Sequence, residues 1–139
     1  MYTKVELLRE VVPIKPRTLE EKQRIEEFLK RGRALFPTGQ YIFQPTEKNK
    51  TLDRKYNLRD KDKVEIMKTL QADDCVDIKQ NDNPRYPDAD LFVFQKTVEL
   101  ESYGEKETVE LYIKDYIWMC QDRMERVIIL SFHEEGLYD

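Results

Sequence analysis

Three segments in the last third of the chain alternate between apolar and polar residues as β-strands do. They are Leu91–Lys96, Thr108–Lys114 and Arg126–His133. A charged hairpin around Ser102–Glu105 joins the first two, and a second short connection joins the last two. Because strands joined by short connections pair in an antiparallel manner, the pattern predicts an antiparallel β-meander over residues 90–134.

Regular alternation also assigns the side chains of these strands to two faces. In the middle strand one face holds Val109, Leu111 and Ile113. The opposite face holds Glu110, Tyr112 and Lys114. In the last strand, alternation places Val127, Ile129 and Ser131 opposite Ile128, Leu130 and Phe132. Both faces of the flanking strands are therefore expected to be at least partly covered.

A helical part precedes the meander. The residues Thr18-Leu19-Glu20-Glu21 fit a capping box, in which the Thr hydroxyl and the Glu21 carboxylate satisfy free N–H groups of the first turn. The apolar positions that follow on one side are Ile25, Phe28 and Leu29. This helix is expected to end near Gly32–Leu35.

Three shorter elements are predicted next. The residues Gln40–Gln44 alternate enough for a short strand, which Pro45 ends. Helices are predicted over Lys50–Tyr56 and from an Asp60 N-cap through Leu70. The apolar positions of the second helix are Val64, Ile66, Met67 and Leu70.

Two stretches have no decisive pattern. Met1–Pro16 is compatible with a strand or a short helix, and Gln80–Ala89 is rich in the Asn, Asp and Pro of loops. A chain of 139 residues can bury one core without disulfides or metals. We therefore expect a single α+β domain (1–139) with an N-terminal extension (1–17) and a mainly helical part (18–79). Its helices should pack on a C-terminal antiparallel sheet of three or more strands (90–134).

The cysteines and the apolar runs indicate the cellular compartment in which the chain is expected. Cys75 and Cys120 are far apart and form no CxxC pair, which favours ordinary thiols in a reducing compartment. No apolar run approaches the roughly 18 residues of a membrane span, and the N-terminus lacks a signal-peptide pattern. We expect a cytoplasmic protein with no membrane partner, no metal and no cofactor.

Charge is unevenly distributed along the chain. Up to Arg85 there are 19 Lys and Arg against 15 Asp and Glu (net +4), and from Tyr86 onward 5 against 13 (net −8). The acidic part argues against nucleic acid, since phosphates are contacted mainly by Lys and Arg. The basic excess within residues 48–63 is either a solvated helix face or a nucleic-acid patch. The candidate substrate-binding residues are Lys55, Arg59 and, in the last strand, Arg126.

Polar residues of catalytic type accompany the predicted strands. Lys96 and Lys114 each end a strand, and the third strand ends on His133, the only histidine. A base, an acid and a cation around one phosphate can cleave RNA through the ribose 2′-OH. The ordinary interpretation remains open, because a strand-end histidine is commonly a surface residue and Tyr112 and Lys114 are ordinary neighbours on a sheet face.

Three motifs, in their order, resemble the C-terminal part of the motility quorum-sensing regulator (MqsR) family of mRNA interferase toxins. They are Leu91-Phe92-Val93-Phe94-Gln95-Lys96, Glu110-Leu111-Tyr112-Ile113-Lys114 and Ile129-Leu130-Ser131-Phe132-His133-Glu134. The resemblance spans roughly residues 25–134 and rests on the order of the motifs. It implies a RelE-like ribonuclease fold and a type II toxin, which cuts single-stranded mRNA without a metal and is inhibited by a cognate antitoxin protein.

The resemblance also implies functional positions. Carried over residue by residue, they are Tyr112, His133, Gln95 and a lysine near Lys79. His133 would transfer a proton, because an unperturbed imidazole has a pKa of about 6.5. Lys96 or Lys114 would stabilise charge on the phosphate, and Tyr112 would stack on a base or bind a phosphate. The alternative is a non-enzymatic module that keeps the toxin fold and binds a basic protein through its acidic sheet end.

Overall fold

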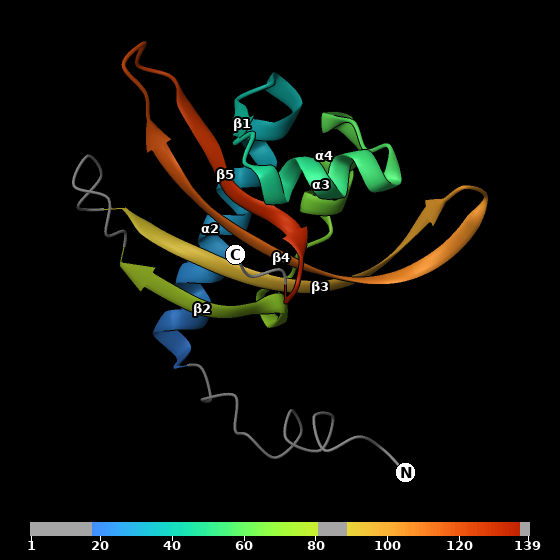
Figure 1. Ribbon diagram of the computed structural model, residues 1–139. Coiled ribbons are helices and arrows are strands. Elements are labelled where there is room, and N and C mark those ends of the chain that lie inside the picture. Colours follow the sequence, from blue (N-terminus) through green and yellow to red (C-terminus); the bar gives the residue numbers. More distant parts are fainter. Residues whose placement is uncertain (1–17, 81–88, 137–139) are drawn as a thin grey trace.

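The computed structural model describes residues 18–80 and 89–136 (Figure 1). The expectation for Met1–Pro16 and nearly all of the predicted loop Gln80–Ala89 lie outside the described residues. The helices are α2 (Leu19–Leu35), α3 (Glu47–Tyr56), α4 (Asp60–Lys68) and the short 3-10 helices η1 (Phe36–Thr38) and η2 (Ala72–Asp74). The strands are β1 (Tyr41–Phe43), β2 (Cys75–Gln80), β3 (Asp90–Ser102), β4 (Glu105–Met119) and β5 (Glu125–Glu134). No helix within these two ranges is long and apolar enough to cross a bilayer.

The ends of the helices follow local chemistry. The capping box before α2 is confirmed, since the Thr18 hydroxyl accepts from the Glu21 N–H and the Glu21 carboxylate accepts from the Thr18 N–H. The predicted Asp60 N-cap is wrong by one position. Arg59 is the N-cap of α4, because the Asp62 carboxylate accepts its backbone N–H at 2.9 Å.

The strands form one mixed sheet in the order β1-β5-β4-β3-β2. The antiparallel β3-β4-β5 meander is as predicted, and the architecture is α+β with the helices before the long strands. The short β1 pairs with β5 in a parallel manner, and β2 adds an antiparallel edge next to β3. The sequence did not predict β2, because four of its six residues are exposed and a bulge between Cys75 and Asp77 interrupts its alternation.

All three helices contribute to one apolar core on a single face of the sheet, which we call the inner face. In Figure 1, α2 runs behind the strands and crosses them. The largest fully buried side chains of this core are Phe94, Phe132, Ile25, Leu52, Leu70, Leu111, Ile113 and Ile129. The opposite, outer face has a smaller apolar cluster made mostly of strand residues, including Leu91, Tyr116 and Ile128.

A β-bulge divides β5 into two parts. Lys114 pairs with Ser131 and the next residue, Asp115, pairs with Ile129, so Leu130 is an extra residue without a partner on β4. The inner face therefore takes Val127 and Ile129 before the bulge but Phe132 after it. The predicted regular alternation of this strand is wrong beyond Leu130. The bulge turns Ser131 away from the face of Val127 and Ile129.

The hairpin of β3 and β4 extends beyond the rest of the sheet, and we call residues 97–110 the hairpin arm. Strand β2 pairs with β3 only up to Phe94, and β5 pairs with β4 only from Leu111. Figure 1 shows the arm, gold to orange, curving away past the other strands. Its inner side is held by the helices, since Tyr56 donates a hydrogen bond to the Glu107 carboxylate at 2.8 Å.

Candidate functional site

One row of side chains crosses three strands on the outer face. Gln95 of β3 pairs with Tyr112 of β4, and Tyr112 pairs with His133 of β5. The rings of Tyr112 and His133 stack, with centroids 5.4 Å apart and planes inclined by 23°. Tyr112 is half-buried, and His133 is 8% exposed. The fold thus brings together three of the residues that the sequence singled out.

The adjacent row adds a cation and a hydroxyl. Lys114 follows Tyr112 by two residues on the same face, about 7 Å along the strand. It pairs with Val93 on one side and with Ser131 on the other, and both polar residues are half-buried. We call Gln95, Tyr112, Lys114, Ser131 and His133 the outer-face patch.

An acidic residue after β5 borders this patch. The Glu135 carboxylate accepts a hydrogen bond from Gln95 Nε2 at 3.2 Å, and its backbone N–H donates to the Glu110 carbonyl at 2.8 Å. Because β4 lies between β3 and β5, the contact between Gln95 and Glu135 reaches across β4 beside Tyr112. The sequence-based reasoning did not include Ser131 or Glu135 among the site residues. Only the cross-strand register reveals them.

The surroundings of His133 fix which ring nitrogen has the proton in the neutral form. His133 Nδ1 lies 2.8 Å from the carbonyl oxygen of Glu134. A carbonyl oxygen can only accept, so Nδ1 holds the hydrogen and Nε2 keeps its lone pair. When the imidazole is neutral, this contact therefore favours the tautomer whose Nε2 can accept a proton.

Lys96 lies apart from the patch. It pairs with Leu111, which is fully buried in the inner core, so it lies on the opposite face from its neighbour Gln95. Its ammonium group lies 3.3 Å from the Asp74 carboxylate and 3.4 Å from the Thr69 carbonyl oxygen, to which it donates. These contacts connect β3 to the segment that follows α4. Lys96 is therefore not brought together with Tyr112 or His133.

Lys79 is on the outer face but far from the patch. It lies on β2 and pairs with Leu91, four residues before Gln95 on β3. Four residues correspond to about 13 Å along a strand. The structure thus separates this lysine from Gln95 by that length and by one strand.

The three candidate substrate-binding residues do not meet each other. Lys55, at the end of α3, lies 3.1 Å from the Glu134 carboxylate, and this hydrogen bond raises the pKa of Lys55. Arg59 is beside Asp62 at the start of α4. Arg126 of β5 donates from Nη1 and Nη2 to the carboxylate of Asp122 in the β4–β5 connection, which lowers the pKa of the Asp122 carboxyl to about 2.

The inner face contains one buried acid that the sequence-based reasoning did not single out. Asp115 is 1% exposed, and its Oδ1 has no hydrogen-bond partner among the described residues. Burial away from water disfavours the charged form, so the pKa of Asp115 is raised well above its usual value. Its pairs on β3 and β5 are the apolar Phe92 and Ile129. Nothing in this environment links Asp115 to the chemistry of the outer face.

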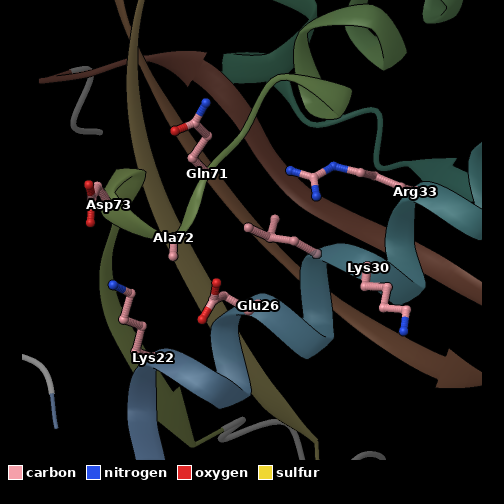
Figure 2. Close-up of a pocket in the computed structure, with 8 residues that line it drawn as sticks. Lys22, Glu26, Lys30, Arg33, Gln71, Ala72 and Asp73 are labelled. Atoms are coloured by element: carbon pink, nitrogen blue, oxygen red, sulfur yellow. The ribbon is translucent and has the colours of Figure 1, made fainter. Parts of the chain in front are cut away.

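Two open grooves flank α2. The groove in Figure 2, about 610 Å³, lies between α2 and the η2 segment, and its charged lining combines Lys22, Lys30 and Arg33 with Glu26 and Asp73. Arg33 is already engaged with the Lys68 and Leu70 carbonyl oxygens. The second groove, about 540 Å³, is lined by apolar residues such as Phe28 and Phe92 and by charged ones, including Arg24, which pairs with Asp90, and Arg31, which pairs with Glu125. Mixed charge and existing partners make both grooves weaker candidates than the outer-face patch.

Metal ligands do not gather in the described part of the chain. Within residues 18–80 and 89–136, no group of three or more His, Cys, Asp or Glu side chains is arranged to hold a metal ion. Cys75 is buried, Cys120 is half-buried, and neither forms a disulfide.

Comparison with protein-family models, with curated proteins and with solved structures finds no match to this chain. A function therefore has to be argued from the residues of the patch and from the resemblance of the three motifs.

Proposed function

We propose that the outer-face patch cleaves single-stranded RNA by attack of a ribose 2′-OH, and that the chain is an mRNA interferase toxin with a cognate antitoxin. The observation that supports this most is the stacked pair of Tyr112 and His133 beside Lys114 on the outer face, opposite the core formed with α2, α3 and α4. Two neighbouring strands, β4 and β5, supply a proton acceptor, a hydroxyl and a cation within two adjacent rows. Such a set can act on a phosphodiester with its own side chains.

His133 is the proposed general base. Its Nε2 lone pair accepts the proton of the 2′-OH, and the resulting alkoxide attacks the adjacent phosphorus. The bond from phosphorus to the 5′-oxygen breaks, which leaves a 2′,3′-cyclic phosphate and a 5′-hydroxyl end. The Tyr112 hydroxyl protonates the leaving 5′-oxygen, and the proton held by His133 restores the tyrosine.

Lys114 and Gln95 complete the proposed site. The Lys114 ammonium group stabilises the negative charge that builds up on the phosphate oxygens, which is commonly the largest contribution in such sites. One face of the Tyr112 ring is covered by His133, and the contact between Gln95 and Glu135 passes beside it. Tyr112 therefore acts through its hydroxyl rather than by stacking on a base.

The test uses the purified full chain and single-stranded RNA. We expect cleavage that leaves cyclic phosphate ends and stops when the ribose at the cut site is replaced by 2′-deoxyribose. His133→Gln should lower kcat by about 100-fold or more, the range of general acid–base catalysis. Lys114→Ala should lower it similarly, whereas Lys79→Ala, a matched lysine on the same face but distant, should not. Cleavage by His133→Gln at the wild-type rate would contradict the proposal.

The toxin role has a separate test in cells. Induced expression should arrest growth, and His133→Gln should relieve the arrest at equal protein levels. Growth arrest that persists in the His133→Gln strain would separate toxicity from the outer-face patch.

The hairpin arm favours a second candidate, a module that binds a basic protein segment without cleaving RNA. The arm contains five Glu and one Lys, and its β3 edge beyond Lys96 has no strand neighbour among the described residues. Tyr103 at the tip is fully exposed. A free strand edge can pair with an extended peptide, and the negative charge selects basic segments over nucleic acid.

A basic peptide distinguishes this candidate from the nuclease. A ten-residue peptide of alternating lysine and valine should shift the NMR signals of the arm, and Glu99→Lys with Glu101→Lys should weaken its binding about tenfold. Matched reversals on α2, Glu26→Lys with Glu27→Lys, should leave binding unchanged. Arm binding together with absent RNA cleavage would favour the module, and cleavage without arm binding would favour the nuclease.

A further inference from the structure

Two consecutive carbonyl groups of β5 point to the same edge of the sheet. The Ile129 carbonyl oxygen accepts from the Gln44 N–H at 2.9 Å, and the Leu130 carbonyl oxygen accepts from Asn49 Nδ2 at 3.0 Å. In a regular strand, successive carbonyls point to opposite edges. The shared direction is thus the backbone signature of the bulge at Leu130.

One buried side chain of α3 satisfies this irregular backbone. Asn49 is 3% exposed, and its Oδ1 accepts from the Phe132 N–H at 2.9 Å. Its Nδ2 donates to the Leu130 carbonyl oxygen and, at 2.8 Å, to that of Gln44. Strand β1 ends at Phe43, so beyond this point the Asn49 carboxamide takes the place of a neighbouring strand along β5.

The carboxamide distinguishes the bulged register from a regular one. Before the bulge, the Val127 N–H points to the β1 edge and donates to the Gln40 carbonyl oxygen. In a regular strand, every second N–H after Val127 would point to the β1 side, and Ser131 would be among these residues. In the structure, the N–H of Phe132 points there instead. Hydrogen bonds to Leu130 and Phe132 are therefore available to Asn49 only when the extra residue is in place.

We propose that Asn49 is a positioning residue, which stabilises the bulged register of β5 and so holds Ser131 and His133 on the same face as Tyr112. Without the bulge, alternation would turn His133 to the face of Val127 and Ile129, which is the inner core. Asn49 acts through the backbone of β5, since its three hydrogen bonds reach main-chain groups. The expected loss of catalysis rests on the proposed function. The pairing register of β5 with β4, however, can be measured in a protein that has no activity.

The experiment compares Asn49→Ala with Leu52→Ala in the full chain. Leu52 lies on the same helix and is 1% exposed, so its truncation destabilises α3 packing while it keeps the Asn49 carboxamide that binds the bulge. By NMR, the cross-strand contacts between the backbones of Tyr112 and His133 should weaken several-fold or vanish in Asn49→Ala and persist in Leu52→Ala. At a temperature where both variants are folded, kcat should fall at least tenfold in Asn49→Ala, with KM within threefold of wild type.

A second variant covers a failure to fold. Asn49→Ser keeps a polar group that is too short to bridge Leu130 and Phe132, and it should show the same loss of cross-strand contacts. If Asn49→Ala or Asn49→Ser folds and keeps both the wild-type cross-strand contacts and the wild-type kcat, the inference is overturned. If the wild-type protein cleaves no RNA, the proposed function fails, while the NMR comparison still decides whether Asn49 sets the register.

Discussion

Polar side chains lie in opposite environments on the two faces of β4. On the outer face, Tyr112 and Lys114 are half-buried; Tyr112 stacks on His133 of β5, and Lys114 pairs with Ser131. On the inner face, the next residue, Asp115, is buried opposite the apolar Phe92 and Ile129, and one of its carboxyl oxygens has no partner in residues 18–80 and 89–136. A polar residue in a strand is therefore informative about function only once its face is known.

The same difference in burial separates two lysines, one in a helix and one on the outer face of the sheet. Lys63 of α4 is 3% exposed, and its ammonium group lies 2.9 Å from the Asp53 carboxylate and above the Phe43 ring. Lys114 is half-buried on the outer face, beside Ser131. The buried lysine is committed to holding α4 against α3 and β1, whereas the outer-face lysine is placed where an anion could reach it.

The largest expected effect is on the inner face. Ile113→Ala removes a fully buried side chain and should lower the free energy of unfolding by about 2–5 kcal/mol, because the core cannot fill the cavity. Thr97→Ala, on the exposed outer side of β3, should change it by about 0.5 kcal/mol or less. Urea unfolding followed by circular dichroism measures both. Equal losses of unfolding free energy in the two variants would contradict the predicted difference between the inner and the outer face.

The two lysines predict the next largest difference. Lys63→Met leaves the Asp53 carboxylate without its cation, and breaking a buried pair in this way should lower the free energy of unfolding by about 3 kcal/mol. Lys114→Met should change it by about 0.5 kcal/mol or less. The same urea titrations apply, and a similar effect of both substitutions would show that Lys114 is structural as well.

The buried acid predicts a pH dependence. Between the usual pKa of about 3.9 and the raised pKa of Asp115, the folded state binds a proton that the unfolded state has lost. The stabilising contribution is present below this window and is lost as pH rises, by up to about 1.4 kcal/mol per pH unit. Asp115→Asn lacks this dependence. Its free energy of unfolding, relative to that of the wild type, should therefore rise between pH 4.5 and pH 8. Parallel stability curves for the two proteins would contradict the burial argument.

The smallest expected change in stability belongs to the patch itself. Tyr112→Phe keeps the ring that stacks on His133 and should alter the free energy of unfolding by about 0.5 kcal/mol or less. The same variant should lower RNA cleavage at least tenfold, because the proposed acid is gone. Loss of stability without loss of cleavage would place the hydroxyl in packing rather than chemistry.

The sequence predicted what depends on local pattern. The capping box placed the start of α2, alternation placed Tyr112 and Lys114 on one face of β4, and the order of the elements gave the α+β class. A helical period and a strand period are each properties of neighbouring residues. They need no knowledge of distant contacts.

What the sequence could not predict depends on contacts between distant segments. The bulge in β5 is bound by Asn49, a residue 83 positions before Phe132, so no local pattern in the strand reveals it. The polar strand β2 forms because β3 offers it an edge. Lys96 looked like a partner of the patch, but its ion pair with Asp74 and its register place it on the other face.

The hydrogen bond between Gln95 and Glu135 has a practical meaning for how the protein is handled. It ties Glu135, which follows β5, to Gln95 of β3 opposite Tyr112, so the last described residues border the outer-face patch. A purification tag or fluorescent fusion that disturbs Glu135 would also disturb its contact with Gln95 in the patch. Assays of untagged protein, or of protein whose tag has been removed, therefore give the fairest measure of the native surface.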